Sequence, residues 1–124
     1  MPNNPNGYNV NGTDVVQSGT NYVVITPSTQ GIYARSAGVN YQNDNKYRVR
    51  LVSIDIIIPI NQASNYVIVY CDENPVPTVV SANYGFITGL NTLSFPLVFF
   101  VPPNFYYRVD GNAFSYNHWV EYNI

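Results

Sequence analysis

The 124-residue sequence has few charged side chains, one cysteine and one histidine. Charged residues make up 10% of the chain, whereas typical soluble domains carry about 25%. A free monomer normally stays soluble through surface charge, so either neutral polar groups replace charge here or much of the surface is buried against partners. We expect both, because 18 asparagines supply uncharged polar groups.

These scarcities exclude several classes of protein. A lone Cys71 cannot form an intrachain disulfide, which is compatible with folding in a reducing cytoplasm. With His118 it is also too little to complete a zinc site, so no metal is expected. The five Lys and Arg residues form no run, which argues against a nucleic-acid partner bound through phosphates. Residues 1–10 lack the regions of a signal peptide, and the nearly apolar stretch 95–103 is too short to insert across a membrane.

No catalytic constellation stands out either. His118 falls in a predicted strand beside Trp119, where a packing or interface role is the simpler interpretation. Cys71 ends a predicted strand and has no base or electropositive pocket in the sequence around it. Asp72 and Glu73 are adjacent, and neighbours on a strand point to opposite faces. No glycine loop of the phosphate-binding type is present, so we expect no catalytic residue, no cofactor and no enzymatic activity.

What the chain has in abundance is typical of β-structure. There are 17 Val, ten Ile and 12 Tyr, against four Leu and five Ala. β-Branched and aromatic residues favour strands, while Asn, Gly and Pro favour turns. Short strand-like runs recur at a spacing of roughly 8–12 residues, which indicates an antiparallel β-sandwich. We expect an extended N-terminal arm over 1–20 and one sandwich domain over 21–124, with strands at 22–26, 32–35, 39–41, 47–60, 66–71, 78–81, 95–101, 105–109 and 118–122.

The longest of these runs changes its pattern in the middle. Apolar residues alternate at Tyr47, Val49 and Leu51, and then shift by one position to Val52 and the isoleucines that follow. A shift of one residue moves every side chain to the other face of a strand. The pattern therefore predicts a β-bulge near Leu51–Val52, with two strands on different sheets as the alternative.

The run from Phe95 to Val101 is apolar on both faces. Such a strand is normally buried on both sides. In a two-sheet sandwich the second face needs a cover, which a neighbouring subunit or a loop of the same chain can supply. We favour the subunit and assign an oligomer interface to Phe95, Val98, Phe100 and Tyr106.

Two segments resemble a recurrent bacteriophage domain found at the ends of tail fibres and on other virion proteins. The first is Arg35-Ser-Ala-Gly-Val-Asn-Tyr41-Gln-Asn43-Asp-Asn-Lys-Tyr-Arg-Val49, similar to the family's Arg, small residue, Tyr-x-Asn, turn and strand. The second is Val101-Pro-Pro-Asn-Phe-Tyr-Tyr-Arg-Val109, followed ten residues later by Trp119-Val-Glu121-Tyr. The likeness covers roughly residues 33–124. It departs at Asn104, where the family usually has Gly, and at Asn45-Lys46-Tyr47, which replaces a Lys-Pro turn.

The resemblance implies a jelly-roll-like sandwich, usually trimeric, in a virion and without catalysis. The motif residues have structural explanations. The two prolines stop a strand ladder by removing donors, and Asn104 keeps a turn with positive φ. Trp119 is expected in the core, and Glu121 is expected to pair with an arginine such as Arg35 or Arg108. The structural motif set is thus Arg35, Tyr41, Asn43, Pro102, Pro103, Trp119 and Glu121.

Three functions compete at this point. The first is a homotrimeric capsid decoration or cement protein, because the chain is nearly all domain and has no fibre shaft. It would bind the major capsid protein through many weak contacts. The second is a tail-fibre tip or receptor-binding protein that joins other tail proteins and recognises a host glycan. The third is a free sugar-binding module or a small hydrolase. The first two place the chain in a virion assembled in the host cytoplasm.

Overall fold

The computed structural model describes residues 7–10, 13–16, 21–25 and 35–124. Within these ranges the chain forms strands and no helix, which confirms the all-β prediction. The strands are β1 (Gly7–Val10), β2 (Thr13–Val16), β3 (Asn21–Ile25), β4 (Tyr41–Gln42), β5 (Arg50–Ile58), β6 (Asn65–Asp72), β7 (Val80–Phe86), β8 (Leu93–Val101), β9 (Tyr106–Gly111) and β10 (Ser115–Asn123).

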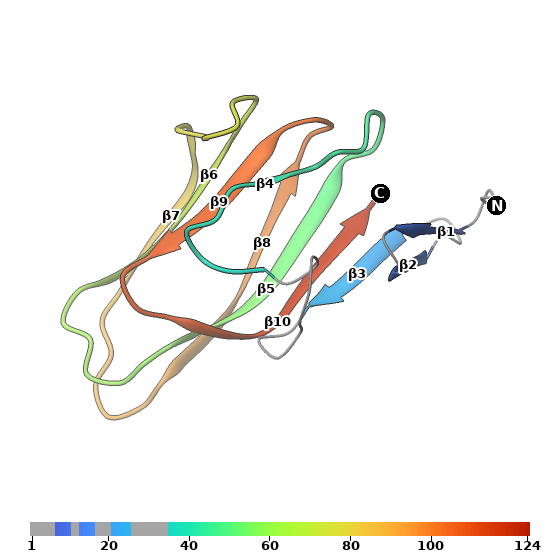
Figure 1. Cartoon of the computed structure of the whole chain (residues 1–124). Helices are drawn as coiled ribbons and strands as arrows, with labels where there is room; N and C mark the ends of the chain where they lie inside the picture. Colours follow the sequence, from blue (N-terminus) through green and yellow to red (C-terminus); the bar gives the residue numbers. More distant parts are fainter. Residues whose placement is uncertain (1–6, 11–12, 17–20, 26–34) are drawn as a thin grey trace.

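Eight of the strands build two four-stranded antiparallel sheets (Figure 1). The first sheet has the order β3-β10-β5-β8 and the second the order β4-β9-β6-β7. From β3 to β10 successive strands alternate between the two sheets, except that β6 and β7 lie in the same sheet, which is the arrangement of a jelly roll. Strands β1 and β2 pair only with each other, so the described part of the expected arm contains a short two-stranded ladder. Most of the strand predicted at 32–35 lies outside the described residues.

The core lies between the two sheets and follows the period of two. On β5 every second side chain, from Val52 to Ile58, is fully buried. The same alternation buries Leu97 and Val101 on β8. From the other strands the core receives Val67, Val69, Tyr107, Val109 and Trp119, all without exposed surface.

The bulge predicted near Leu51–Val52 is wrong. β5 pairs with β8 without interruption from Arg50 opposite Val101 to Ile58 opposite Leu93. The strand begins only at Arg50, so Tyr47 and Val49 belong to a loop. Their alternation therefore does not indicate which face of the sheet they lie on. That loop is organised by Asn45 instead, whose Oδ1 accepts hydrogen bonds from the backbone N–H of Tyr47 and Arg48 at 2.9 Å each. Register shifts occur elsewhere, between Tyr116 and Trp119 of β10 and on the β6–β7 pair.

Most of the other predicted strands are confirmed. The runs at 66–71, 95–101, 105–109 and 118–122 lie almost wholly in β6, β8, β9 and β10, and 22–26 overlaps β3. The run at 78–81 overlaps only the start of β7, which continues to Phe86. Its later part reads Ala-Asn-Tyr-Gly-Phe, which gave little apolar signal because β7 is an edge strand.

The loops gather at two ends of the sandwich (Figure 1). The antiparallel pairing brings the connections 59–64, 87–92 and 112–114 to one end. The connections 43–49, 73–79 and 102–105 lie at the opposite end, together with the C-terminus, because Asn123 pairs with Arg50. The two ends differ in charge, and the polar residues of the sequence motifs lie at the second one.

Candidate functional site

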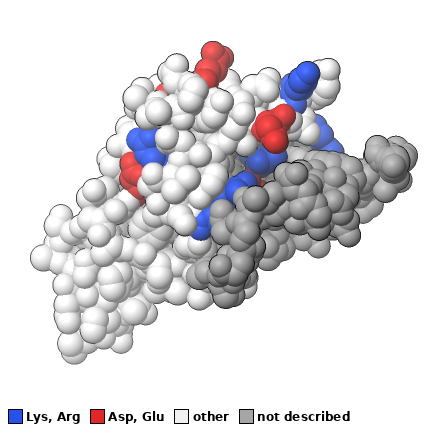
Figure 2. Space-filling view, viewed as in Figure 1, with Lys and Arg blue, Asp and Glu red and all other residues white. Residues whose placement is uncertain are grey.

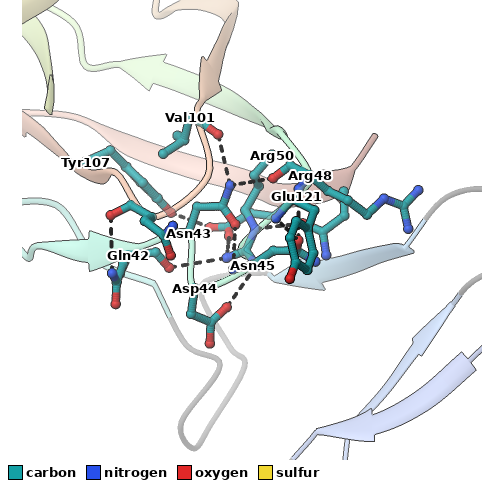
Figure 3. A network of polar contacts seen from close by, with 12 residues as sticks. Gln42, Asn43, Asp44, Asn45, Arg48, Arg50, Val101, Tyr107 and Glu121 are labelled. Atoms are coloured by element: carbon teal, nitrogen blue, oxygen red, sulfur yellow. Dashed lines mark hydrogen bonds and ion pairs between the residues drawn. The ribbon is translucent and has the colours of Figure 1, made fainter. Parts of the chain in front are cut away.

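A buried polar network occupies the end of the sandwich that holds the C-terminus (Figure 3). It starts with Asn43, which has no exposed surface. The Nδ2 of Asn43 donates to the carbonyl oxygens of Arg48 at 2.9 Å, Val101 at 3.0 Å and Pro102 at 3.2 Å. Its backbone N–H donates to the carbonyl of Phe105 at 2.8 Å. One side chain therefore ties the 43–49 loop to the end of β8 and the turn that follows.

That turn confirms the expected role of the prolines and of Asn104. Neither Pro102 nor Pro103 carries an N–H, and β8 ends at Val101, directly before them. Asn104 has a φ of 68°. Asparagine is one of the few residues other than glycine that adopt this left-handed conformation without large strain, so the turn is kept without the glycine.

The carboxylate of Glu121 is the centre of the network. It is 3% exposed and accepts hydrogen bonds from four side chains. Arg35 donates through Nε at 2.9 Å, Trp119 through Nε1 at 3.1 Å and Arg50 through Nη1 at 3.3 Å, and the hydroxyl of Tyr107 donates as well. A buried carboxylate needs partners of this kind, because an unpaired charge in the interior is very costly.

The sequence left Arg35 and Arg108 open as partners of Glu121, and the structure selects Arg35. Arg108 projects from the other side of β9, where its Nε pairs with Asp110 at 2.8 Å. Because Tyr107 and Val109 on either side of Arg108 are fully buried, the alternation of the strand turns Arg108 outward.

Aromatic rings pack against the residues of this network. The guanidinium of Arg35 lies 4.3 Å from the ring centre of Tyr41, a cation–π distance. Tyr41 also packs against Trp119 and Tyr107, with ring centres 6.3 Å and 5.6 Å apart. The Tyr41 hydroxyl accepts a hydrogen bond from the backbone N–H of Ser36 at 2.7 Å. All the predicted motif residues thus meet at one end of the sandwich.

Three members of the network were missed by sequence reasoning. Tyr107 is fully buried with its hydroxyl on Glu121, although it sat in the sequence as one of two adjacent tyrosines. Arg50 bonds to Glu121 and also to the Oδ1 of Asn123 at 3.1 Å. The alternation of β9 could have marked Tyr107 as inward, but nothing in the sequence singled out Arg50 or Asn123.

The pKa shifts of Glu121 and Tyr107 indicate that the network stabilises the fold and does not transfer protons. Burial by itself would raise the pKa of Glu121, but the charge and hydrogen bond of Arg35, helped by Arg50 and Tyr107, hold that pKa below its ordinary 4.5. Burial, with the charge of Glu121 nearby, raises the pKa of Tyr107 well above 10.0. Glu121 therefore stays ionised and Tyr107 stays protonated near neutral pH, which is the opposite of a group poised to exchange protons.

The predicted interface residues do not share one surface. Val98 and Phe100 lie on the outer face of the first sheet, 50% and 58% exposed. Phe95 has the parity of the core residues and packs against Phe86 of the second sheet, with ring centres 4.8 Å apart. Tyr106 is in β9 of the second sheet, opposite Gln42 and Asp72. The structure therefore places Phe95 and Tyr106 outside the surface that carries Val98 and Phe100.

An apolar patch surrounds Val98 and Phe100. Directly paired residues lie on the same face, so Val98 is followed across the sheet by Ser53 and Val120, and Phe100 by Leu51 and Tyr122. We call this set the outer patch: Leu51, Val98, Phe100, Val120 and Tyr122. β8 is also the free edge of its sheet within the described strands.

The remaining candidates for chemistry do not form a reactive site in the described part of the chain. Burial, followed by the charge of Asp72, raises the pKa of Cys71 to about 11, so its thiol is protonated near neutral pH. Asp72 accepts backbone N–H groups from Asn74 and Thr78 at 2.7 Å each and from Val79 at 3.0 Å, which fixes the 73–79 turn. Among the described residues no group of three His, Cys, Asp or Glu side chains is placed to hold a metal ion.

Comparisons of this chain with family models, with curated proteins and with solved structures found no match. A search of the described residues for a helix long and apolar enough to cross a membrane found none.

Proposed function

We propose that the chain is a non-enzymatic structural protein of a bacteriophage particle, acting as a homotrimeric decoration or cement protein on the head surface. The observation that best supports self-association is the outer patch. It places the exposed Val98 and Phe100, beside the half-buried Leu51, Val120 and Tyr122, on the outer face of a sheet whose edge strand β8 is unpaired on one side among the described strands, a combination that marks interaction surfaces. The low overall charge supports the same conclusion, because surface that is buried against partners needs no charge.

The placement in a virion is supported by the sequence motifs and by their convergence. Arg35 and Tyr41 are far from Trp119 and Glu121 in the chain, yet the four residues meet in one buried network. The order of strands in the two sheets is that of a jelly roll, a fold that recurs in viral capsid proteins. A cement protein would use such a rigid domain to bury surface across the joints between capsid subunits.

A tail-fibre tip that binds a host glycan is the second candidate, and one observation favours it. On the outer face of the second sheet, the guanidinium of Arg108 lies 4.5 Å from the ring centre of Tyr70. Arg108 also bonds to Asp110 at 2.8 Å and to Asn40 at 2.9 Å. An aromatic face beside carboxylate and amide groups suits sugar recognition.

Immunogold electron microscopy of the source phage, with antibody against the recombinant chain, separates the two. We expect label spread over the head in many copies. Label confined to the tail would establish the fibre-tip function and direct a glycan screen at the Tyr70–Arg108 cluster. Label on no particle would contradict the virion assignment altogether.

The outer patch gives a second test. Phe100→Asp places a charge in the middle of the patch, so we expect it to block assembly while the subunit stays folded. Analytical ultracentrifugation measures assembly, and thermal unfolding checks the fold. Val76→Asp is the matched control, because Val76 is 60% exposed and lies in the 73–79 loop between β6 and β7 of the other sheet. A Phe100→Asp protein as fully oligomeric as the parent would contradict the interface.

A further inference from the structure

Strand β7 is a free edge of the second sheet. Among the described strands it pairs on one side only, with β6 (Figure 1). Exposed edges are normally protected against further pairing by charged side chains, prolines or bulges. β7 contains no charged residue and no proline, and its register shift lies before Ala82, so the rest of the strand is regular. By contrast, the edge strand β8 contains Pro96, and the edge strand β4 has only two residues. β7 is therefore open to a further strand.

The pairing of β6 shows which backbone groups of β7 are free. The N–H of Tyr66 donates to the side chain of Asn112, directly after β9, at 2.9 Å. Successive residues of a strand direct their backbone groups to opposite sides, so Tyr66 and Ile68 bond toward β9 and not toward β7. Gly85 lies opposite Tyr66, and Asn83 lies opposite Ile68. The N–H and C=O groups of Asn83 and Gly85 therefore point away from β6, at two exposed positions of the edge.

An incompletely covered aromatic side chain lies between these two positions. Tyr84 has the same parity on β7 as Ala82 and Phe86, which pack against the core. Its ring centre lies 5.6 Å from that of Phe95, yet the residue is 41% exposed. The edge thus combines unpaired backbone groups with aromatic surface that a neighbouring strand would cover.

The chain on this side of the sandwich carries no charge. Residues 74–107, which include β7 and β8, contain no Asp, Glu, Lys or Arg. The lower-left part of the surface in Figure 2, over the connection from β7 to β8 in Figure 1, shows no charged side chain. A surface that meets its own copy across a two-fold axis brings each charge close to its equivalent, which is unfavourable. An uncharged edge is free of this repulsion.

We propose that β7 pairs antiparallel with β7 of a second copy of this chain, across a two-fold axis at Tyr84. In this register Asn83 of each copy lies opposite Gly85 of the other, and each pair exchanges both of its N–H···O bonds. The two Tyr84 side chains meet at the intervening position without hydrogen bonds, where side chains of opposite strands are closest. The two four-stranded sheets then form one continuous sheet.

A second copy fits this edge because the edge is complementary to itself. Asn83 and Gly85 each offer one donor and one acceptor, so the same two residues satisfy each other across the axis. The edge belongs to the second sheet and the outer patch to the first, so the inference goes beyond the proposed function and does not depend on it. If both contacts form, pairing of β7 would join homotrimers to one another.

The test uses the full-length protein with Phe100→Asp, which removes the contact proposed at the outer patch and leaves β7 unchanged. Asn83→Pro is added to remove the outward N–H, which the ladder with β6 does not use. Asn83→Ala is the matched control, because it removes the same side chain and keeps the N–H. Thermal unfolding checks the fold of each protein. Analytical ultracentrifugation measures association, and amide hydrogen exchange by NMR follows the N–H groups of Asn83 and Gly85.

We expect the Phe100→Asp protein to form a dimer, with exchange at Asn83 and Gly85 slowing as the dimer forms. Asn83→Pro should raise the Kd of the dimer at least about tenfold, because each dimer loses two hydrogen bonds, and Asn83→Ala should dimerise like the background. If Asn83→Pro does not fold, the exchange measurement alone decides.

Three results would overturn the inference and leave the proposed function standing. A background protein that is monomeric up to about 1 mM would leave the edge to a strand of a different protein. A dimer with unchanged exchange at Asn83 and Gly85 would use another surface. Equal effects of Asn83→Pro and Asn83→Ala would show that the backbone N–H has no part in the contact.

Discussion

Glu121→Gln is expected to lower the free energy of unfolding by about 3–5 kcal/mol, the usual cost of removing one partner from a buried ion pair. Every neighbour of the carboxylate donates a hydrogen bond to it: Arg35, Arg50, Tyr107 and Trp119. Glutamine has the same shape, but its amide NH2 would face donors. Arg35 would also lose the buried counter-charge. Urea unfolding of the variant and the parent measures the difference.

Glu73→Gln is the matched control, because Glu73 is the only other glutamate and is exposed in the 73–79 turn. We expect it to change stability by less than about 0.5 kcal/mol. A Glu121→Gln protein as stable as the control would show that the network contributes no net stability.

The same pair of proteins tests the charge state of Glu121. Its pKa in the folded protein lies below the ordinary 4.5, so the ionised carboxylate contributes its stability above pH 4.5. That contribution is lost as the pH falls through the folded-state pKa. The stability difference between parent and Glu121→Gln should therefore be constant near neutral pH and shrink in acid. A difference that grows in acid would contradict the assigned ionisation.

The polar network around Glu121 could be predicted from the sequence only in part. The motif residues were found as a set because their order in the chain resembled a known pattern, and the structure brings them together. The choice between Arg35 and Arg108 could not be made from the pattern alone, since it depends on which face of β9 is inward. The burial of Tyr107 and Val109 decides it, because an alternating strand then turns Arg108 away from Glu121.

The errors have a common physical cause. The bulge at Leu51–Val52 was inferred from a parity change, but parity has meaning only inside a strand, and β5 begins at Arg50. Phe95 was assigned to an interface although it has the parity of Leu97 and Phe99, which are buried. In both cases the alternation itself was read correctly. The sequence did not show where β5 begins, and it did not show which side of β8 the second sheet covers.

The surface formed by the connections 59–64 and 87–92 could not be predicted from the sequence, for a related reason. Leu90 lies in a connection where no strand was predicted, and Ile60, expected at the end of the strand 47–60, lies beyond the last residue of β5, Ile58. They become one surface only through the hydrogen bonds of Thr88 and Asn61 across the two loops. Periodicity reports on strands, and a surface assembled from loops is therefore outside what it can indicate.

Trp119→Ala is the second change with a large expected effect, a loss of about 3–5 kcal/mol of stability. Trp119 is the largest fully buried side chain, and its ring centre lies 5.2 Å from that of Tyr116 and 6.3 Å from that of Tyr41. Truncation would leave a cavity between the sheets and remove a hydrogen bond from Glu121. His118→Ala, at the exposed neighbouring position, is the control and should leave the melting temperature nearly unchanged.

Trp119→Phe separates the two contributions of the indole. Phenylalanine keeps most of the buried ring but has no N–H, so its cost reports chiefly the hydrogen bond to Glu121. If the network is cooperative, the cost of Trp119→Phe should fall when Glu121→Gln is already present, because the acceptor has then lost its charge. Strictly additive costs would mean that Trp119 stabilises the fold by packing alone, and that Glu121 is held by its arginines and Tyr107 without the indole.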